Sequence, residues 1–287
     1  MIIDRLHEEV LNKGNVCVGL DTHYDYIPEG FKKRFNSPAE AILNYNLSLI
    51  DALKDKCAIF KVQISYYEAL GLEGLKVYAE TLKYIRKNGM LAISDIKRGD
   101  IAKTAGQYAK AHFEGDFESD FITVNPYMGM DSIEPYEEYI RRGDKGIFPL
   151  IRTSNKGARD IQFEKLENGK TVFEHTGDQI YDLANKYIGD CGYSSIGGVV
   201  GCTHEDESEE IRNRYKNMFF LIPGYGAQGG AATVVNKLLN RGNGGVVNSS
   251  RGILMAYKKY ENGELNPIEC AVKEVEDMRK VIGVINE

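Results

Sequence analysis

Leu91-Ala92-Ile93-Ser94-Asp95-Ile96-Lys97-Arg98-Gly99-Asp100-Ile101 is a segment that starts apolar and ends in closely spaced charges. The apolar start predicts a β-strand, and the charges then fall at its C-terminal end. Because side chains alternate between the two faces of a strand, Asp95 and Lys97 share one face, and Asp100 follows in the turn. Charges at a place where strands usually bury apolar side chains are costly unless they are paired. The segment therefore predicts a strand with chemistry at its end.

Short apolar runs recur along the chain and predict eight strands. They cover residues 16–20, 58–63, 91–96, 121–125, 146–151, 197–202, 219–223 and 245–248. Amphipathic stretches alternate with them and no linker separates two halves. This order predicts an α/β fold, a (β/α)8 TIM barrel that forms a single domain over residues 1–287. A doubly wound open sheet shares the alternation, but eight strands in a chain of this length favour the barrel.

Helical periodicity predicts the elements between the strands. These helices cover residues 37–54, 73–87, 131–142, 171–188, 205–215, 231–239 and 267–282. In the first of them Ser37 is the expected N-cap, Pro38 takes the first helical position and Glu40 completes a capping box. The irregular segment 153–170 is long enough to be a functional or a disordered loop.

Composition and charge limit the classes of partner. The chain has 287 residues and a formal net charge of −6, which argues against a general nucleic-acid or membrane-surface binder. No apolar run approaches the length of a membrane span, and the first residues lack the layout of a signal peptide. The 5 cysteines are odd in number and include no CxxC pair, so we expect reduced thiols and a cytoplasmic location.

Polar residues gather at the ends of the predicted strands, where (β/α)8 barrels carry their active sites. They are Asp21, Lys61, Asp95, Lys97, Asn125, Arg152, Thr153, Ser154, Asn155, Thr203, His204, Asn248, Ser249, Ser250 and Arg251. Taken alone, the central charges also fit a buried salt-bridge network without catalysis. Their position among so many other polar strand ends favours an active site.

The loops after strands seven and eight predict a phosphate site. They cover residues 224–230 and 249–252, and their glycines allow backbone N–H groups to approach an anion. Arg251 offers a planar set of donors for phosphate oxygens, and Gln228 can donate its amide N–H. A turn that needs glycine for a positive φ is the alternative explanation, but two such loops together with an arginine favour phosphate.

Gly224-x-Gly226-x-x-Gly229 also matches the dinucleotide fingerprint, which would indicate a nicotinamide-dependent oxidoreductase. That fingerprint normally opens the first βαβ unit and needs an acidic residue at the end of the next strand. Here it lies in the seventh unit, and the next strand ends in Asn248-Ser249. We therefore favour a small phosphorylated ligand over a dinucleotide.

Asp21-x-His23 and His204 match a metal site loosely, because they offer three ligands from two strand ends. Such a site would suit a metal-dependent sugar-phosphate aldolase on a related phosphate-binding barrel, which is the alternative function. Full activity in excess chelator would exclude it. A non-enzymatic nucleotide-binding module is a further alternative, but it would not need four charges at the centre of the barrel. His112 and His175 fall on helical stretches, and we expect both at the surface.

Taken together, the motifs resemble the orotidine 5′-phosphate decarboxylase family, in its longer bacterial branch. The resemblance rests on Asp95-x-Lys97-x-x-Asp100, on Lys61 one strand earlier and on Asp21 at the end of the first strand. The stretches 152–155, 223–230 and 248–252 strengthen it and occur in the family's order. One departure is Lys156, where that branch usually has proline.

The resemblance implies removal of CO2 from orotidine 5′-phosphate to give UMP, the last step of de novo pyrimidine nucleotide synthesis, with no metal and no cofactor. The step generates negative charge at a ring carbon, which a nearby cation stabilises and an ammonium group can protonate. Lys97 is the candidate for both roles, and Asp95 would sit against the departing carboxylate. Lys61 and Asp100 would complete an alternating network in which each charge has an opposite neighbour.

The resemblance also implies a set of substrate contacts and a partner subunit. It implies that Asp21 and Lys61 hold the ribose and that Ser154 contacts the pyrimidine. Gln228 and Arg251 would hold the phosphate. Asp100 and Thr104 would reach into the other subunit, so the resemblance implies a homodimer with shared active sites. The expected partners are then a small nucleotide and a second copy of the chain.

Overall fold

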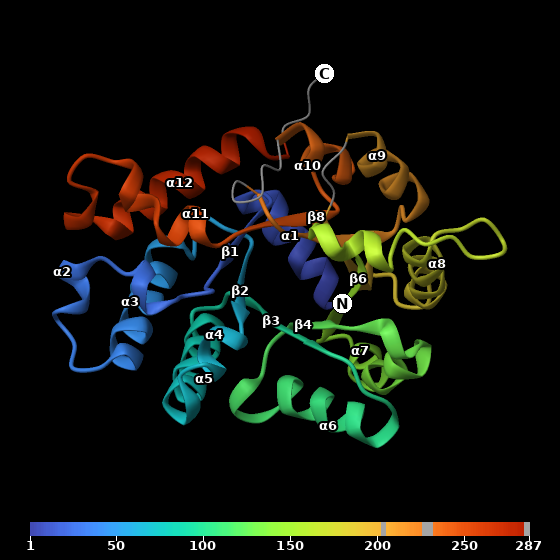
Figure 1. The fold of residues 1–287 in the computed structure, drawn as a ribbon, viewed down its shortest axis with the longest axis horizontal. Helices are drawn as coiled ribbons and strands as arrows, with labels where there is room; N and C mark the ends of the chain where they lie inside the picture. The colour runs from blue at the N-terminus through green and yellow to red at the C-terminus, as the bar shows by residue number, and fades with distance from the viewer. Residues whose placement is uncertain (202–204, 226–231, 284–287) are drawn as a thin grey trace.

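The apolar runs of the sequence form parallel strands that pair in chain order and close into a barrel (Figure 1). The computed structural model describes residues 1–201, 205–225 and 232–283. Within them the strands are β1 Val16–Gly19, β2 Ile59–Gln63, β3 Leu91–Arg98, β4 Phe121–Val124, β5 Gly146–Arg152, β6 Ser194–Val200, β7 Met218–Ile222 and β8 Gly245–Ser249. Pairing of Val16 with Val247 joins the first strand to the last. The predicted (β/α)8 barrel is confirmed, and closure excludes the open sheet.

The sixth strand differs from its prediction. It starts at Ser194 rather than at residue 197, and Ser194 pairs with Met218 of β7. Two serines are a weak strand signal because small polar residues are uncommon in buried strands. Here the Ser194 hydroxyl donates to the backbone oxygen of Ala184 at 2.7 Å, which satisfies it inside the protein. The predicted end of this strand, Cys202, lies outside the described residues.

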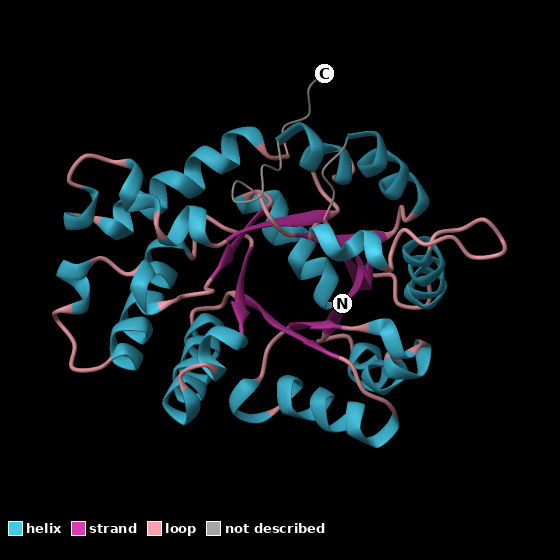
Figure 2. Ribbon diagram, viewed as in Figure 1, coloured by secondary structure: helices cyan, strands magenta, loops and turns pink. Residues whose placement is uncertain are grey.

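Helices surround the strands as an outer layer, except α1, which lies across one end of the barrel (Figure 2). In the described residues they are α1 Ile2–Lys13, α2 Glu29–Lys32, α3 Pro38–Leu53, α4 Ser65–Glu68, α5 Gly71–Lys87, α6 Ala102–Phe113, α7 Glu137–Arg142, α8 Val172–Ala184, α9 Glu205–Arg214, α10 Ala232–Leu238, α11 Arg251–Leu254 and α12 Pro267–Val281. α1 and α6 are long helices that the periodicity did not predict. No helix within the described ranges is both long and apolar enough to cross a membrane.

The predicted start of α3 is confirmed, but its capping box is not. The Ser37 hydroxyl accepts the backbone N–H of Glu40 at 3.2 Å, and Pro38 opens the helix. The carboxylate of Glu40, however, accepts the N–H of Asn36 at 2.9 Å instead of that of Ser37. The reciprocal bond is thus displaced by one residue, and it still satisfies a donor just before the helix.

The single helix predicted over residues 131–142 is wrong. The segment forms two short 3₁₀ turns, Met130–Ser132 and Glu134–Tyr136, before α7 begins at Glu137. Pro135 lies in the second turn and explains the break, because proline has no N–H to donate and restricts the residue before it.

The core places apolar side chains at one end of the barrel and polar ones at the other. The inner face of the strands is filled near their N-terminal ends by Ile59, Leu91, Ile93, Phe121, Phe148 and Phe219, with Ile3 and Leu6 of α1 packed against them. Because inward positions recur every second residue, the next inner positions are Lys61 on β2, Asp95 on β3 and Thr123 on β4. The barrel is therefore closed at its N-terminal end and polar at its C-terminal end.

His112 corrects another expectation, since it is buried rather than at the surface. Its ring stacks on Phe117 and meets Tyr78 edge-on. Burial and the nearby Arg98 lower the pKa of His112 to about 4, so the ring is neutral at physiological pH. His175 on α8 is exposed, as expected.

Candidate active site

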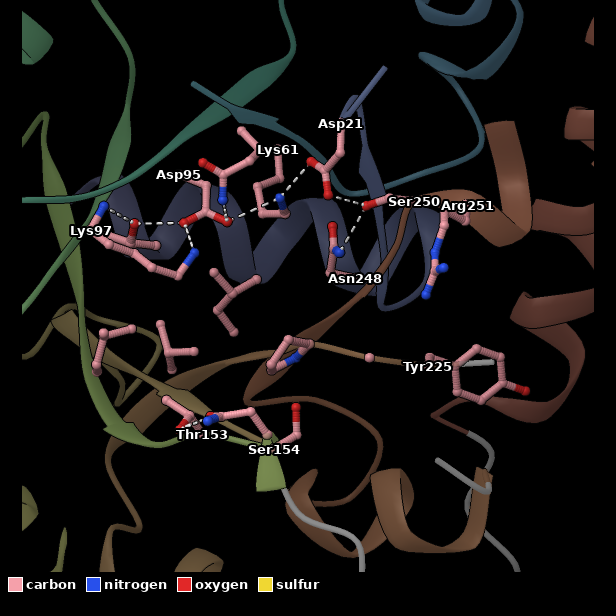
Figure 3. Close-up of a pocket in the computed structure, with 18 of the residues that line it drawn as sticks. Asp21, Lys61, Asp95, Lys97, Thr153, Ser154, Tyr225, Asn248, Ser250 and Arg251 are labelled. Atoms are coloured by element: carbon pink, nitrogen blue, oxygen red, sulfur yellow. Dashed lines mark hydrogen bonds and ion pairs between the residues drawn. The ribbon is translucent and has the colours of Figure 1, made fainter. Parts of the chain in front are cut away.

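A cavity of about 540 Å³ opens at the C-terminal end of the barrel (Figure 3). Its walls come from the strand ends and the loops that follow them. Predicted residues that line it are Asp21, Lys61, Asp95, Lys97, Ser154 and Arg251. Figure 3 shows Lys97 and Asp95 at one end of the cavity and Arg251 with Tyr225 at the other. The motifs that the sequence spreads over more than two hundred residues thus meet around one space.

Four charged side chains form a continuous alternating chain at this cavity. Lys97 Nζ lies 2.6 Å from Asp95 Oδ1, and Lys61 Nζ lies 3.1 Å from Asp95 Oδ2. Lys61 Nζ also lies 2.8 Å from Asp21 Oδ1. The order is therefore Asp21, Lys61, Asp95, Lys97, with opposite charges at every step. Each of these four charges has an oppositely charged partner, as the cost of burial requires.

Burial and ion pairing shift the pKa values of Lys61 and Asp95 in opposite directions, and ion pairing has the larger effect. Burial alone would lower the pKa of Lys61, but the carboxylates of Asp21 and Asp95 raise it above its ordinary value. Burial alone would raise the pKa of Asp95, but Lys61, Lys97 and a hydrogen bond from Thr123 hold it well below its usual range. Lys61 is therefore held as an ammonium and Asp95 as a carboxylate.

Thr123 is a site residue that sequence reasoning missed. Its hydroxyl donates to Asp95 Oδ1 at 2.8 Å and accepts the backbone N–H groups of Ile96 and Lys97 at 3.0 and 2.9 Å. These bonds hold the end of β3 where Lys97 has a φ of +45°, a conformation that is uncommon for lysine. The pairing of β3 with β4 shifts register at this point, between Ser94 and Arg98. Thr123 thus fixes both Asp95 and the backbone that carries Lys97.

The Asp21 end of the network is held by the last strand. The Ser250 hydroxyl donates to Asp21 Oδ2 at 2.7 Å, and the Asn248 side chain donates to Ser250 Oγ at 3.2 Å. This approach requires Gly19 on β1, because a Cβ there would lie 2.0 Å from Ser250 Oγ. Asn248 and Ser250 belong to a motif that the sequence singled out, but their contact with Asp21 could not be foreseen. Gln63 is a further missed residue, donating to Asp95 Oδ2 at 3.0 Å.

The remaining walls carry the predicted base and phosphate residues. Ser154 lies on the loop after β5, on the side of the cavity opposite Asp21 (Figure 3). Arg251 opens α11, is exposed, and lines the cavity together with Pro223 and Gly224. Gln228, the other predicted phosphate residue, lies outside the described residues.

Lys156, where the sequence departs from its family's pattern, is exposed and does not line the cavity. It opens a 3₁₀ turn, Lys156–Asp160, that follows the base-side loop. The departure therefore leaves the described walls of the cavity unchanged.

Asp100 and Thr104 are not brought to the cavity within this chain. The Asp100 carboxylate accepts the N–H of Ile101 at 2.9 Å, just after β3 has ended. Thr104 lies exposed on α6. Within one chain the fourth charge of the network is that of Asp21, which pairs with Lys61. The place of Asp100 in the network is expected across the subunit interface, and one chain does not test it. A role across a subunit interface stays a prediction.

The metal site weighed from the sequence gains no support in the part of the chain that is described. There, no three side chains among His, Cys, Asp and Glu are grouped so that they could hold an ion. His23 is largely exposed, and its Nδ1 accepts the N–H of Asp25 at 3.2 Å. His204 lies outside the described residues.

Comparisons with known proteins agree with this geometry. The model of the orotidine 5′-phosphate decarboxylase / HUMPS family matches residues 14–264. A curated orotidine 5′-phosphate decarboxylase of Clostridium acetobutylicum is 61% identical over 282 residues, which cover 98% of this chain and 99% of that protein. The one from Clostridium novyi is 59% identical over 283 residues, 99% of each. The solved structure of Leishmania donovani OMP decarboxylase is 27% identical with a TM-score of 0.72, covering 97% of this chain and 98% of that one.

Proposed function

The chain belongs to the orotidine 5′-phosphate decarboxylase / HUMPS family, and from that premise we propose a direct decarboxylation without cofactor in which Lys97 donates the proton. The enzyme is a carboxy-lyase that converts orotidine 5′-phosphate to UMP in pyrimidine synthesis. Identity of this extent to decarboxylases over the whole chain sets aside the aldolase alternative. The observation that carries the proposed mechanism is the alternating chain Asp21, Lys61, Asp95, Lys97 at one end of the cavity.

The two ends of the cavity suit the two ends of the substrate. Arg251 is a planar guanidinium at the start of α11 and suits a phosphate dianion. Gln228, which lies outside the described residues, is proposed for the same phosphate from its sequence motif. With the phosphate there, the pyrimidine extends toward Asp95 and Lys97. Ser154 then faces the base from the loop after β5, while Asp21 and Lys61 lie beside the ribose. These contacts are proposed from the positions of the side chains around the cavity.

The chemical step uses the charges already in place. The bond between C6 of the pyrimidine and the carboxylate carbon breaks, CO2 leaves, and the electron pair stays on C6. The ammonium of Lys97 stabilises that developing charge and then transfers one proton to C6, after which solvent reprotonates the lysine. Asp95 stays ionised beside Lys97 and repels the substrate carboxylate, a repulsion that ends when neutral CO2 departs. Lys61 keeps Asp95 ionised throughout.

The position at which deuterium from the solvent enters UMP tests this mechanism. In D2O the Lys97 ammonium carries deuterium, so we expect UMP with one deuterium on C6 and ordinary hydrogen on C5, read by proton NMR. A route through addition to the ring would pass through a saturated C5 and place deuterium there. Deuterium at C5 at the rate of turnover would contradict direct decarboxylation.

We also propose a homodimer to which Asp100 and Thr104 contribute across the interface. Ile101, next to Asp100, is 43% exposed, and Tyr127, which follows β4, is 81% exposed. Burial of these two side chains against a second subunit would remove apolar surface from water, which supports the proposal. The end of β3 lies against the start of the next loop, since Asn125 donates its N–H to the Arg98 oxygen at 2.7 Å. Asp100 is thus held close to the rim of the barrel mouth.

Mixing two inactive variants tests shared sites. Lys97→Ala and Asp100→Ala homodimers should each be inactive. A mixed dimer holds one site with both substitutions and one site with neither, so mixing should restore up to a quarter of wild-type activity for equal, randomly paired subunits. Full activity of Asp100→Ala alone, or no recovery in a mixture shown to exchange subunits, would contradict a shared site.

A further inference from the structure

Arg152, at the end of β5, is a buried charge that the proposed mechanism does not use, and it forms an ion pair with the partly buried Glu207. Its side chain is 5% exposed, and its guanidinium meets Glu207 of α9 through two bonds, Nε to Oε1 at 2.8 Å and Nη2 to Oε2 at 2.9 Å. The remaining nitrogen, Nη1, donates to the backbone oxygens of Thr153, at 2.9 Å, and Gly201. One side chain therefore ties the loop after β5 to the end of β6 and to the start of α9.

An ion pair of this kind adds little net stability to the packing of a helix against the barrel. Buried ion pairs gain little or nothing over well-packed apolar residues, because both charges must leave water. Their advantage is geometric, since the planar guanidinium accepts only one arrangement of a carboxylate and two carbonyl groups. The position of this pair matters for that reason. It lies one residue before Thr153 and two before Ser154, the proposed contact of the pyrimidine.

Gln162 also holds this loop, through hydrogen bonds to Thr153. The backbone N–H of Thr153 donates to Gln162 Oε1 at 2.9 Å, and Gln162 Nε2 donates to the Thr153 hydroxyl at 2.7 Å. That hydroxyl in turn donates to Asn155 Oδ1 at 2.6 Å. Gln162 comes from the long segment 153–170, which folds back onto its own start. The N–H, the hydroxyl and the carbonyl oxygen of Thr153 are all held, by Gln162 and Arg152 together.

Ser154 is also packed in place. A Cβ at Gly201 would lie 2.9 Å from Ser154 Cβ and 3.1 Å from its backbone nitrogen, so glycine is what allows the end of β6 to lie against this serine. Arg152 joins these two strand ends, because its Nη1 reaches Gly201 and the Arg152 carbonyl accepts the Gly201 N–H at 2.8 Å. A change in Arg152 would therefore move Ser154 relative to the cavity.

We propose that Arg152 and Glu207, with Gln162, are positioning residues that set the enzyme's affinity for the pyrimidine base. They act through Thr153 and Ser154 and touch no substrate atom themselves. This inference rests on the proposed function, because it requires Ser154 to face the base. Among the described residues, no hydrogen bond or ion pair joins this clamp, formed by Arg152, Glu207 and Gln162, to Arg251 at the phosphate end of the cavity. Loosening the clamp should thus weaken recognition of the base and spare recognition of the ribose phosphate.

Two ligands that differ by the base test the proposal. UMP carries the pyrimidine, and ribose 5-phosphate lacks it, so their dissociation constants are measured for wild type, Glu207→Gln and Gln162→Ala. We expect both variants to raise the dissociation constant of UMP by about tenfold or more, as a small misplacement of a binding group does. The dissociation constant of ribose 5-phosphate should stay within about twofold. Gln162 is half-buried, so its variant serves where the loss of a buried charge pair impairs folding.

Glu209→Gln is the matched control. It removes the same charge from the same helix, α9, but from an exposed pair with Lys237 at 2.8 Å. It should leave both dissociation constants unchanged. Equal weakening of UMP and ribose 5-phosphate in the clamp variants, or no change in either, would overturn the inference. Failure of the wild type to bind UMP would instead overturn the proposed function on which it rests.

Discussion

Thr123→Val removes one hydroxyl and keeps the shape of the side chain, so it isolates what that hydroxyl does. Thr123 is 1% exposed and takes part in three hydrogen bonds, with Asp95, Ile96 and Lys97. In the valine variant two backbone N–H groups lose their acceptor and the Asp95 carboxylate loses a donor. Thr123 is almost wholly buried, so little solvent reaches its hydroxyl position to replace these bonds.

The expected cost follows from those three bonds. A buried donor without a partner costs about 1–3 kcal/mol, so two would cost about 2–6 kcal/mol if they were independent. They share one acceptor and one short segment, so we expect a loss of about 3 kcal/mol in the free energy of unfolding. The backbone of Lys97, with a φ of +45°, loses the contact that holds it there. Displacement of Lys97 by about an ångström should lower kcat about a hundredfold.

Urea unfolding and steady-state turnover of orotidine 5′-phosphate measure both effects. Thr123→Ser is the control, because it keeps the hydroxyl and loses only a buried methyl group. It should cost about 1 kcal/mol of stability and retain most of the turnover. A Thr123→Val enzyme with wild-type kcat would refute the reasoning, since it would show that Lys97 is placed without this hydroxyl.

Two further variants probe the ends of the site. Arg251→Ala should keep the fold and raise the dissociation constant of UMP by about ten- to a hundredfold, because it removes about one charge-assisted hydrogen bond to the phosphate. An unchanged dissociation constant in a titration would mean that the phosphate binds elsewhere. Asp95 has a lowered pKa in the folded state, so its stabilisation is present above about pH 4 and is lost as the pH falls further. Asp95→Asn should therefore make the acid loss of stability shallower between about pH 5 and 2. Equal slopes in wild type and variant, measured by urea unfolding at each pH, would contradict the pairing.

Much of the barrel could be predicted because buried parallel strands are short apolar runs. Every predicted strand is present, and the inward face of β3 follows the period of two from Leu91 to Asp95. The helix α6 could not be found in this way. Its buried side chains include Ala105, Ala109 and His112, and small or polar residues do not form an apolar stripe in the sequence. Burial there comes from close packing rather than from large apolar groups.

The sequence predicts most of the residues of the candidate site, but it does not predict which of them contact one another. A strand pattern indicates the face on which Asp95 and Lys97 lie, but it does not indicate which side chain from another strand reaches them. Asp21 was expected beside a ribose, and it also pairs with Lys61, a contact that the sequence did not indicate. Thr123 gave no signal, because threonine on the inner face of a strand is typical of ordinary β-structure. Only the register of the closed barrel places its hydroxyl against Asp95.

The most direct test of the central claim follows the ultraviolet absorbance of orotidine 5′-phosphate mixed with purified protein in excess chelator. Wild type and Lys97→Ala are compared, with binding of UMP measured for both. We expect wild type to consume the substrate, and Lys97→Ala to bind UMP but to turn over at least about a thousandfold more slowly. Near-normal turnover by Lys97→Ala would contradict its role as proton donor. Loss of wild-type activity in chelator would contradict a reaction without metal.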